Sequence, residues 1–236
     1  SNTDGMFWHY NGTVWEDPIQ IKVEGNDIHL IQRLWGISAN EIYAVGYAQP
    51  YYGSDIWKGI IFKYNGKTWT QIAIPDIQLN FIHIRKAVNG DLIIYAWDEK
   101  TGELSFYTYN GKELTKLFVT DGMLAALERI GDQTFFSKGQ VIYEYKNKSY
   151  EVWKDLTGTE YYGTIFCFRS VKDIFTRTTD GKGIGHYNGS DFKVICTVEG
   201  TRFLILTGIA FEKDVYFLVR DYTASKTRIL HGKLKE

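Results

Sequence analysis

The chain has 236 residues with 27 basic and 28 acidic side chains, and its formal net charge of −1 gives no excess of positive charge for binding duplex nucleic acid or an anionic membrane surface. We therefore expect no nucleic-acid partner. Aromatic residues make up 16% of the sequence and only three prolines occur, a composition typical of β-sheet proteins.

The first five residues are interpreted as a tag remnant or a disordered start, because Ser1-Asn2 has the form of a scar left by a cleaved expression tag. The start of the chain therefore says nothing about a leader sequence. No apolar run of membrane-spanning length occurs, so we expect no membrane insertion of the domain itself.

A short motif recurs along the chain, in which a tyrosine is followed two positions later by Gly or Asn and five positions later by a large apolar residue. Its copies are WHYNGTVW (8–15), FKYNGKTW (62–69), YTYNGKEL (107–114), YEYKNKSY (143–150) and GHYNGSDF (185–192). Asn-Gly between alternating segments predicts a β-hairpin, because both residues tolerate the positive φ of a type I′ turn. We expect the motif's aromatic residues to pack between structural elements.

A second motif alternates with the first and places an acidic residue at the start of an apolar strand. The acidic residues are Glu41, Asp91, Asp132, Asp173 and Asp214, and the last three intervals are each 41 residues. Aspartates in such positions commonly accept hydrogen bonds from turn backbone, so we expect these four to cap turns.

Four strands in each repeat of about 40 residues, joined by short turns, are typical of a β-propeller blade. A two-sheet sandwich would explain the many strands but not the fixed period. We therefore predict an all-β fold, a single β-propeller over residues 1–236 with four-stranded antiparallel blades. Inner strands are expected to begin near Ile31, Phe81, Leu124, Gly163 and Leu204, which gives five blades, with six as the alternative.

The two ends of the chain are expected to share the last blade. The chain stops after a third strand, TRILHGKL, and TVWEDPI (13–19) is predicted to be the outer strand, so that pairing of N- and C-terminal strands closes the ring. Residues 6–10 also have the pattern of a third strand, so two segments compete for one place in this blade.

Cys167 and Cys196 are predicted to be buried free thiols on the inner and outer strands of one blade. Strands three places apart are separated by about 14 Å. Disulfide formation needs Cα atoms within about 7 Å, so this placement excludes a bond between them.

The string LWGISANEIYAVG, followed by GIIFKYNGKTWTQI, resembles the tandem repeat of bacterial secreted or lipoprotein propellers, whose units read WG-x-S-x-x-(D/E)-(V/I)-Y-A-V-G and then G-x-I-x-x-Y-(D/N)-G-x-x-W. The match is confined to residues 34–72, and later repeats lack the Trp-Gly pair. The resemblance implies the propeller fold and an extracytoplasmic location, whether periplasmic, on the cell surface or secreted. It implies no activity, because the repeat residues of this mostly uncharacterised family build turns.

No motif for metal binding or catalysis stands out. The histidines His9, His29, His83, His186 and His231 are scattered, with no pair at metal-ligand spacing, so we expect no metal and no cofactor. Neither Gly-x-Ser-x-Gly nor a phosphate-binding glycine loop occurs.

The predicted inner strands are rich in arginine. They carry Arg33, Arg85, Arg129 and Arg169, with Glu128 as their only acid. This set suits acid–base catalysis poorly and an anionic ligand better, although we expect the arginines to pair with acidic residues between blades.

The connections of a propeller fall on two opposite faces. On one face the turns are short and polar, whereas the connections of the other face are longer and often aromatic, as in AQPYYGSDIW (48–57). Loops positioned by a rigid scaffold commonly carry function. We therefore predict a ligand-binding face formed by Tyr51, Tyr52, Asp55, Trp57, Trp97, Asp98, Tyr161, Tyr162, Asp180 and Tyr222.

Aromatic rings beside carboxylates suit a sugar ring, and Tyr and Trp also dominate protein interfaces. We expect a monomeric, noncatalytic binding module for a glycan or a protein partner. The alternative is a carbohydrate-active hydrolase or lyase that uses Asp55, Asp98 or Asp180 as acids. For any single ring, sealing the end of a blade is an equally good interpretation.

Overall fold

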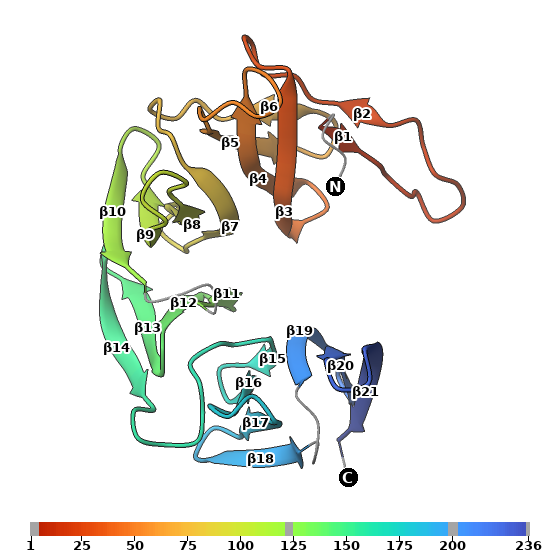
Figure 1. Ribbon diagram of the computed structural model, residues 1–236, viewed down its shortest axis with the longest axis vertical. Helices are drawn as coiled ribbons and strands as arrows, with labels where there is room; N and C mark the ends of the chain where they lie inside the picture. The colour runs from red at the N-terminus through yellow and green to blue at the C-terminus, as the bar shows by residue number, and fades with distance from the viewer. Residues whose placement is uncertain (1–4, 121–124, 198–202, 235–236) are drawn as a thin grey trace. The chain divides into compact units, whose positions relative to one another are not determined.

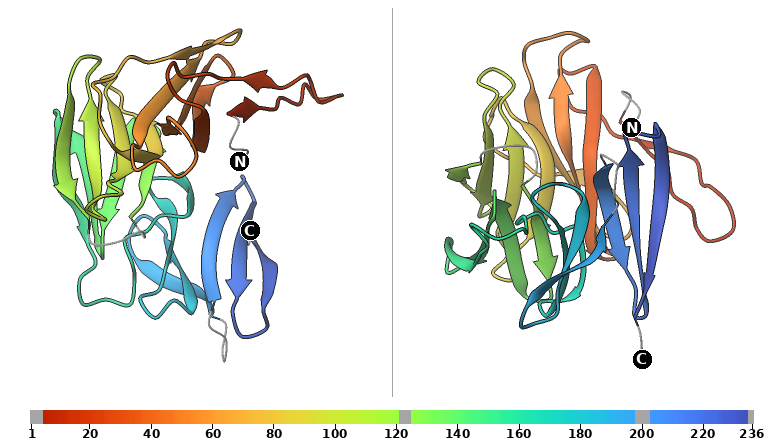
Figure 2. Two further views of the ribbon diagram at one scale, coloured as in Figure 1. Left: turned by 45° about the horizontal axis from the view of Figure 1, so that its top comes forward. Right: turned by 60° about the horizontal axis from the view of Figure 1, so that its bottom comes forward.

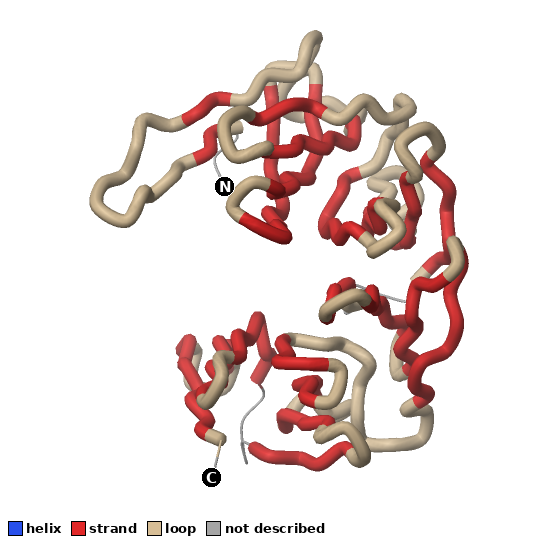
Figure 3. Tube along the Cα trace, turned by 180° about the vertical axis from the view of Figure 1, so that it is seen from behind, coloured by secondary structure: helices blue, strands red, loops and turns tan. Residues whose placement is uncertain are grey.

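The computed structural model describes residues 5–120, 125–197 and 203–234, and all regular structure in these ranges is β-strand (Figure 3). The predicted fold class is confirmed: the chain is an all-β propeller with five blades, four of them with four antiparallel strands and the last with three described strands. Residue contacts divide the chain into two compact units, residues 1–120 and 121–236. The single-domain organisation stays a prediction, and the tag assignment falls on residues 1–4, which lie outside the described ranges, and on Gly5.

The first unit contains a hairpin and two blades (Figure 1). Its strands are β1 (Met6–Phe7), β2 (Ile19–Gln20), β3 (Ile28–Ser38), β4 (Glu41–Gln49), β5 (Lys58–Tyr64), β6 (Trp69–Gln71), β7 (Asn80–Lys86), β8 (Leu92–Trp97), β9 (Leu104–Tyr109) and β10 (Leu114–Val119). Blade 1 is β3-β4-β5-β6 and blade 2 is β7-β8-β9-β10, so strands adjacent in sequence are adjacent in the sheet. Val45 and Ile61 of blade 1 share one core with Phe81, Ile84 and Ile94 of blade 2.

The second unit contains three blades. Its strands are β11 (Leu127–Ile130), β12 (Gln133–Lys138), β13 (Val141–Lys146), β14 (Ser149–Asp155), β15 (Cys167–Ser170), β16 (Asp173–Arg177), β17 (Gly183–Tyr187), β18 (Phe192–Thr197), β19 (Phe203–Ala210), β20 (Asp214–Asp221) and β21 (Lys226–Lys233). Blades 3, 4 and 5 are β11 to β14, β15 to β18 and β19 to β21. Phe135 and Ile174 join blades 3 and 4 in one core, and Phe175 and Phe217 join blades 4 and 5 in another.

Most predicted inner strands begin within three residues of the expected position. The exception is blade 4, where the strand begins at Cys167 instead of near Gly163. The Gly163 N–H donates to the Gly139 carbonyl oxygen (3.0 Å), so this residue belongs to the connection that crosses blade 3. The predicted start at Leu124 lies outside the described residues.

The hairpin turns form where the motif predicts them, but most are not type I′. In four of them the Asn side chain accepts hydrogen bonds from two following N–H groups; for Asn65 the donors are Lys67 and Thr68, both at 2.9 Å. Only the glycine of such a turn has positive φ, as in Gly66 at 92°. Blade 3 is the exception, because Asn147 (54°) and Lys148 (62°) form a two-residue loop with both φ angles positive.

The acidic residue that opens the second strand contacts side chains. Asp173 lies 2.5 Å from Arg169 Nε and 2.8 Å from His186 Nε2, and Asp214 lies 2.6 Å from His231 Nε2. The predicted turn-capping role is therefore wrong for these two aspartates. Each histidine lies on the third strand of its blade, opposite the residue two positions after the aspartate, Phe175 or Tyr216.

Two inner-strand arginines pair with acids of their own blade, and the other two contact side chains of the neighbouring blade. Arg169 binds Asp173, and Arg129 Nη2 lies 3.5 Å from Asp132 of the same turn. Arg85 is buried, donates to the Ile84 carbonyl oxygen (2.7 Å) and lies over the Trp35 ring. Arg33 Nη2 lies 3.2 Å from His83 Nε2.

The N-terminal segment differs from its predicted role as an outer strand. Residues 13–19 are not a strand; Ile19–Gln20 pairs with Met6–Phe7 in a separate two-stranded sheet. The segment folds back on itself because Asn11 caps the turn and Tyr10 bridges to Trp15. Figure 2 shows this hairpin extending beyond blade 1. Its Phe7 ring stacks on Trp69 of β6, with centroids 4.3 Å apart.

The two cysteines lie on the inner strand β15 and the outer strand β18 of blade 4 and are free, as predicted. Cys167 is buried, and burial raises the pKa of its thiol to about 12. Cys196 is only half-buried, because it lies on the outer strand.

Gly46 allows blade 1 to tolerate a β-bulge. The β3–β4 register shifts between Ile31 and Arg33, and the Leu30 carbonyl oxygen then occupies the place where a Cβ on Gly46 would lie. Backbone atoms cannot move aside as a flexible side chain can.

We expect Gly46→Ala to lower the free energy of unfolding by about 3 kcal/mol through overpacking. Gly53→Ala is the comparison, since no atom lies near its added Cβ and only its positive φ of 84° is unfavourable, at a cost of about 1 kcal/mol. Denaturant unfolding of both variants measures the difference. Equal costs would contradict the role of the Leu30 carbonyl.

Glu41 predicts a pH-dependent contribution to stability. The hydrogen bond from Lys86 (2.7 Å) is the main cause that lowers the Glu41 pKa to about 2. Because the folded pKa lies below the unfolded value, the contribution is complete above about pH 5 and is lost as the pH falls toward 2. Wild type should exceed Glu41→Gln in unfolding free energy by about 1 to 2 kcal/mol at pH 7, and the gap should shrink by pH 3. A gap that is independent of pH in denaturant titrations would refute this assignment.

Candidate ligand-binding pocket

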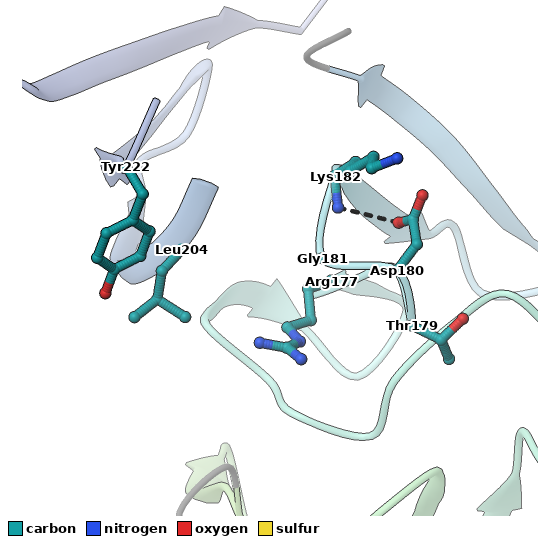
Figure 4. A pocket seen from close by; sticks show the side chains of 7 residues that line it. All are labelled: Arg177, Thr179, Asp180, Gly181, Lys182, Leu204 and Tyr222. Atoms are coloured by element: carbon teal, nitrogen blue, oxygen red, sulfur yellow. Dashed lines mark hydrogen bonds between the residues drawn. The ribbon is translucent and has the colours of Figure 1, made fainter. Parts of the chain in front are cut away.

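A cavity of about 530 Å³ lies between blades 4 and 5 in the second unit. It is lined by Arg177, Thr179, Asp180, Gly181, Lys182, Leu204 and Tyr222. These residues come from the end of β16 and the turn after it, the start of β19, and the turn between β20 and β21. All three segments belong to the face that carries the longer connections. Figure 4 shows Tyr222 and Leu204 on one side and the Asp180 turn on the other.

The Asp180 turn is held by its own side chains. Asp180 Oδ1 accepts hydrogen bonds from the Lys182 N–H (2.9 Å) and from the Thr178 hydroxyl (2.5 Å). The Thr178 oxygen in turn accepts the Gly183 N–H (2.8 Å). Because the hydroxyl bond from Thr178 favours the ionised carboxylate most strongly, the pKa of Asp180 is lowered. The turn therefore presents a fixed negative charge.

Arg177 is the cation at the base of the cavity. It is the last residue of β16, and its guanidinium lies over the Tyr162 ring, 5.0 Å from the centroid. The backbone fixes this contact, since the Tyr162 N–H donates to the Arg177 carbonyl oxygen (2.8 Å). The Nε atom is buried and has no hydrogen-bond partner. Burial lowers the pKa of Arg177.

Tyr222 stands on a supported loop. Its neighbour Asp221 is only 2% exposed, accepts the Ala224 N–H (2.9 Å) and lies 2.7 Å from Arg228 Nη2. The Tyr222 side chain is 55% exposed, so a large part of the ring is open to a ligand. The half-buried Leu204 adds an apolar surface beside it (Figure 4).

The second unit brings three of its four predicted site residues together. Asp180 and Tyr222 line the cavity, and Tyr162 lies under Arg177. Tyr161 instead seals blade 4: its ring packs on Phe192, and its hydroxyl donates to the Phe192 carbonyl oxygen (3.1 Å).

In the first unit, the insertion of blade 1 presents its two tyrosines to solvent. Tyr51 and Tyr52 are 63% and 83% exposed, and Asp55 is exposed as well. Trp57 packs on Tyr47, with centroids 4.2 Å apart. This ring stabilises the base of the insertion.

The two site residues predicted on blade 2, Trp97 and Asp98, are engaged in contacts within the blade. Trp97 is half-buried and pairs with Leu104 across β8 and β9. Asp98 accepts hydrogen bonds from the Lys100 N–H (2.9 Å) and the Thr101 N–H (3.2 Å), so its carboxylate caps a turn.

Arg177, one of the two cations that line the cavity, was not among the predicted site residues, because the arginine pattern in the sequence falls on the inner strands. The sequence does contain a signal for it: Arg177 ends a second strand and lies three residues before Asp180, which was predicted as a site residue, so both belong to the same connection. Within the described ranges, no cluster of three or more His, Cys, Asp or Glu side chains could hold a metal ion, and no helix is long and apolar enough to span a bilayer.

The sequence matches no protein-family model and no curated protein. Its structure is similar to YCF48 bound to D1 peptide, with 11% identity, coverage of 98% of this chain and 73% of that chain, and a TM-score of 0.56. It is also similar to a catalytically inactive virginiamycin B lyase from Staphylococcus aureus with quinupristin (10% identity, 96% and 77%, TM-score 0.56) and to a nidogen/laminin complex (10% identity, 95% and 89%, TM-score 0.50). At these identities the likeness shows the fold alone.

The Asp180 turn predicts a measurable titration change. Replacing Thr178 with Val removes the hydroxyl donor, so the pKa of Asp180 should rise toward its ordinary value. Carboxyl-carbon NMR across acidic pH measures the change. Thr179→Val is the matched control, because the adjacent hydroxyl makes no hydrogen bond to Asp180 among the described residues. Equal effects of the two variants would show that Thr178 does not set this titration.

Proposed function

We propose that this protein is a noncatalytic binding propeller whose ligand is a protein or peptide segment, held in the cavity between blades 4 and 5. The observation that carries the proposal is the combination of an exposed Tyr222 ring, the apolar Leu204 and the Arg177 guanidinium around one cavity. Tyrosine and arginine are enriched among the residues that contribute most to protein interfaces.

The solved structures support a protein or peptide ligand over a glycan. YCF48 is bound to a peptide, and the nidogen/laminin structure is a complex of proteins. The cavity also lacks a flat pair of exposed rings for stacking on successive sugars: Tyr222 is the only aromatic residue among its lining residues.

The carboxylates of this face favour binding over hydrolysis. A general acid near neutral pH needs a raised pKa, whereas the Thr178 hydroxyl and the Lys182 N–H lower the pKa of Asp180. Asp98 is likewise engaged by two turn N–H groups. These contacts make both residues acceptors that shape turns.

The proposal includes an extracytoplasmic location. Its support is the resemblance of residues 34–72 to the repeats of bacterial secreted and lipoprotein propellers.

The proposal is tested with a displayed library of random peptides panned against the whole chain. Enriched peptides should bind wild type in fluorescence polarisation, and Tyr222→Ala should weaken them about tenfold or more by removing the exposed ring. Tyr52→Ala, on the blade 1 insertion, should leave their affinity unchanged.

Three results would argue against the proposal. Failure to enrich any peptide above background would remove the claim of a peptide ligand. Peptides that lose affinity with Tyr52→Ala but not with Tyr222→Ala would move the site to the first unit. Turnover in a polysaccharide panel that disappears with Asp180→Asn would favour a hydrolase or lyase.

A further inference from the structure

The guanidinium of Arg177 is incompletely satisfied by the protein. Its Nε is buried without a hydrogen-bond partner, and among the described residues the guanidinium has no ion pair and lies over the Tyr162 ring. Arg169, by comparison, places Nε and Nη2 on the two oxygens of Asp173, at 2.5 and 3.2 Å. A buried charged donor without an acceptor is costly, and no carboxylate of the described residues offsets that cost for Arg177.

The Arg177 side chain is part of the cavity lining. Figure 4 shows the Arg177 side chain extending into the space between the Asp180 turn and the wall formed by Leu204 and Tyr222. The Lys182 side chain extends away from Arg177, so it does not share the same ligand position. Arg177 is therefore the cation that a bound group would meet at the base.

We propose that the cavity recognises a carboxylate of its ligand, either an acidic side chain or the carboxyl end of a peptide, through the guanidinium of Arg177. This inference rests on the proposed function, because it names the group that the peptide presents. Arginine suits the task because its planar fork can donate two parallel hydrogen bonds to one carboxylate. Leu204 and Tyr222 would then contact the apolar part of the same residue or its neighbour.

The charge of the cavity favours a carboxylate over a phosphate. The ionised Asp180 lines the same cavity, and its bond from Thr178 keeps it in the charged form. A phosphate group carries close to two negative charges at neutral pH and three acceptor oxygens. The charged lining residues are Arg177, Lys182 and Asp180, a net charge of +1, which matches a single negative charge better.

The test uses NMR of the whole ¹⁵N-labelled chain and three small probes. N-acetyl-leucine carries a terminal carboxylate, N-acetyl-glutamate α-amide carries a side-chain carboxylate, and N-acetyl-leucinamide carries none. The Nε–H signal of Arg177, assigned by its loss in Arg177→Lys, should shift in a saturable way with at least one carboxylate probe at constant ionic strength. The neutral amide should bind about tenfold more weakly.

Variants separate recognition by Arg177 from general electrostatics. Arg177→Gln should abolish the response of nearby backbone signals to the carboxylate probes, and Arg177→Lys should reduce it, because lysine keeps the charge but loses the fork. Lys172→Gln is the control: this cation lies in the turn between β15 and β16, is not among the lining residues, and its variant should respond like wild type. Preserved spectra far from the cavity establish that each variant is folded.

The outcomes distinguish this inference from the proposed function. A response to only one carboxylate probe shows whether the cavity recognises a terminal or a side-chain carboxylate. A response to both shows that it recognises a carboxylate of either kind. Equal responses to acid and amide, or no response of the Nε–H signal, would overturn the inference. If selected peptides bind Arg177→Gln as tightly as wild type, the cavity binds peptides but carboxylate recognition by Arg177 is refuted. If the library yields no peptide while a carboxylate probe shifts the Nε–H signal, the peptide ligand is refuted and carboxylate recognition stands.

Discussion

Burial of both faces of the middle strands is the constraint on which the first two blades depend. β8, LIIYAW, is buried along almost its entire length, and β9 and β4 are nearly as covered. Such strands need continuous apolar runs, because each face packs against another layer. The only charged side chain of these three strands is Glu41, at the start of β4. The cavity residues likewise lie at strand ends and in turns. The chemistry of this chain is therefore a property of its connections.

This constraint explains why the architecture can be predicted from the sequence. The repeat of apolar strands, acidic starts and Tyr-x-Gly turns predicts the blades and the strand order, and the structure confirms them. Errors occur where the pattern fits two structures equally. Residues 6–19 carry the hairpin motif as well as an outer-strand pattern, and the local Asn11 turn pairs them with each other. Likewise Asn-Gly fits a type I′ turn and a four-residue Asn-capped loop, and side-chain hydrogen bonds select the second.

The candidate site was only partly accessible to sequence reasoning. Composition and loop length selected Asp180 and Tyr222, but about half of the selected aromatic residues have packing roles that depend on contacts, as with Tyr161 against Phe192. Arg177 was missed for the same reason. Its importance comes from having no acidic partner, and a missing partner is a property of the folded neighbourhood that no local motif encodes. Gly183 is a second example of a role that depends on folded contacts. A Cβ at this position would collide with the Thr178 side chain, so only glycine allows Thr178 to lie this close.

The raised pKa of Cys167 has a consequence for thiol chemistry. With a pKa of about 12, only about one thiol in 10⁵ is the reactive thiolate at neutral pH. Disulfide exchange and peroxide oxidation both proceed through the thiolate, so the folded blade makes this sulfur almost inert. The half-buried Cys196 is then the only cysteine with ready access to an oxidant. Within blade 4, oxidation and disulfide exchange are thereby directed to Cys196 rather than to Cys167.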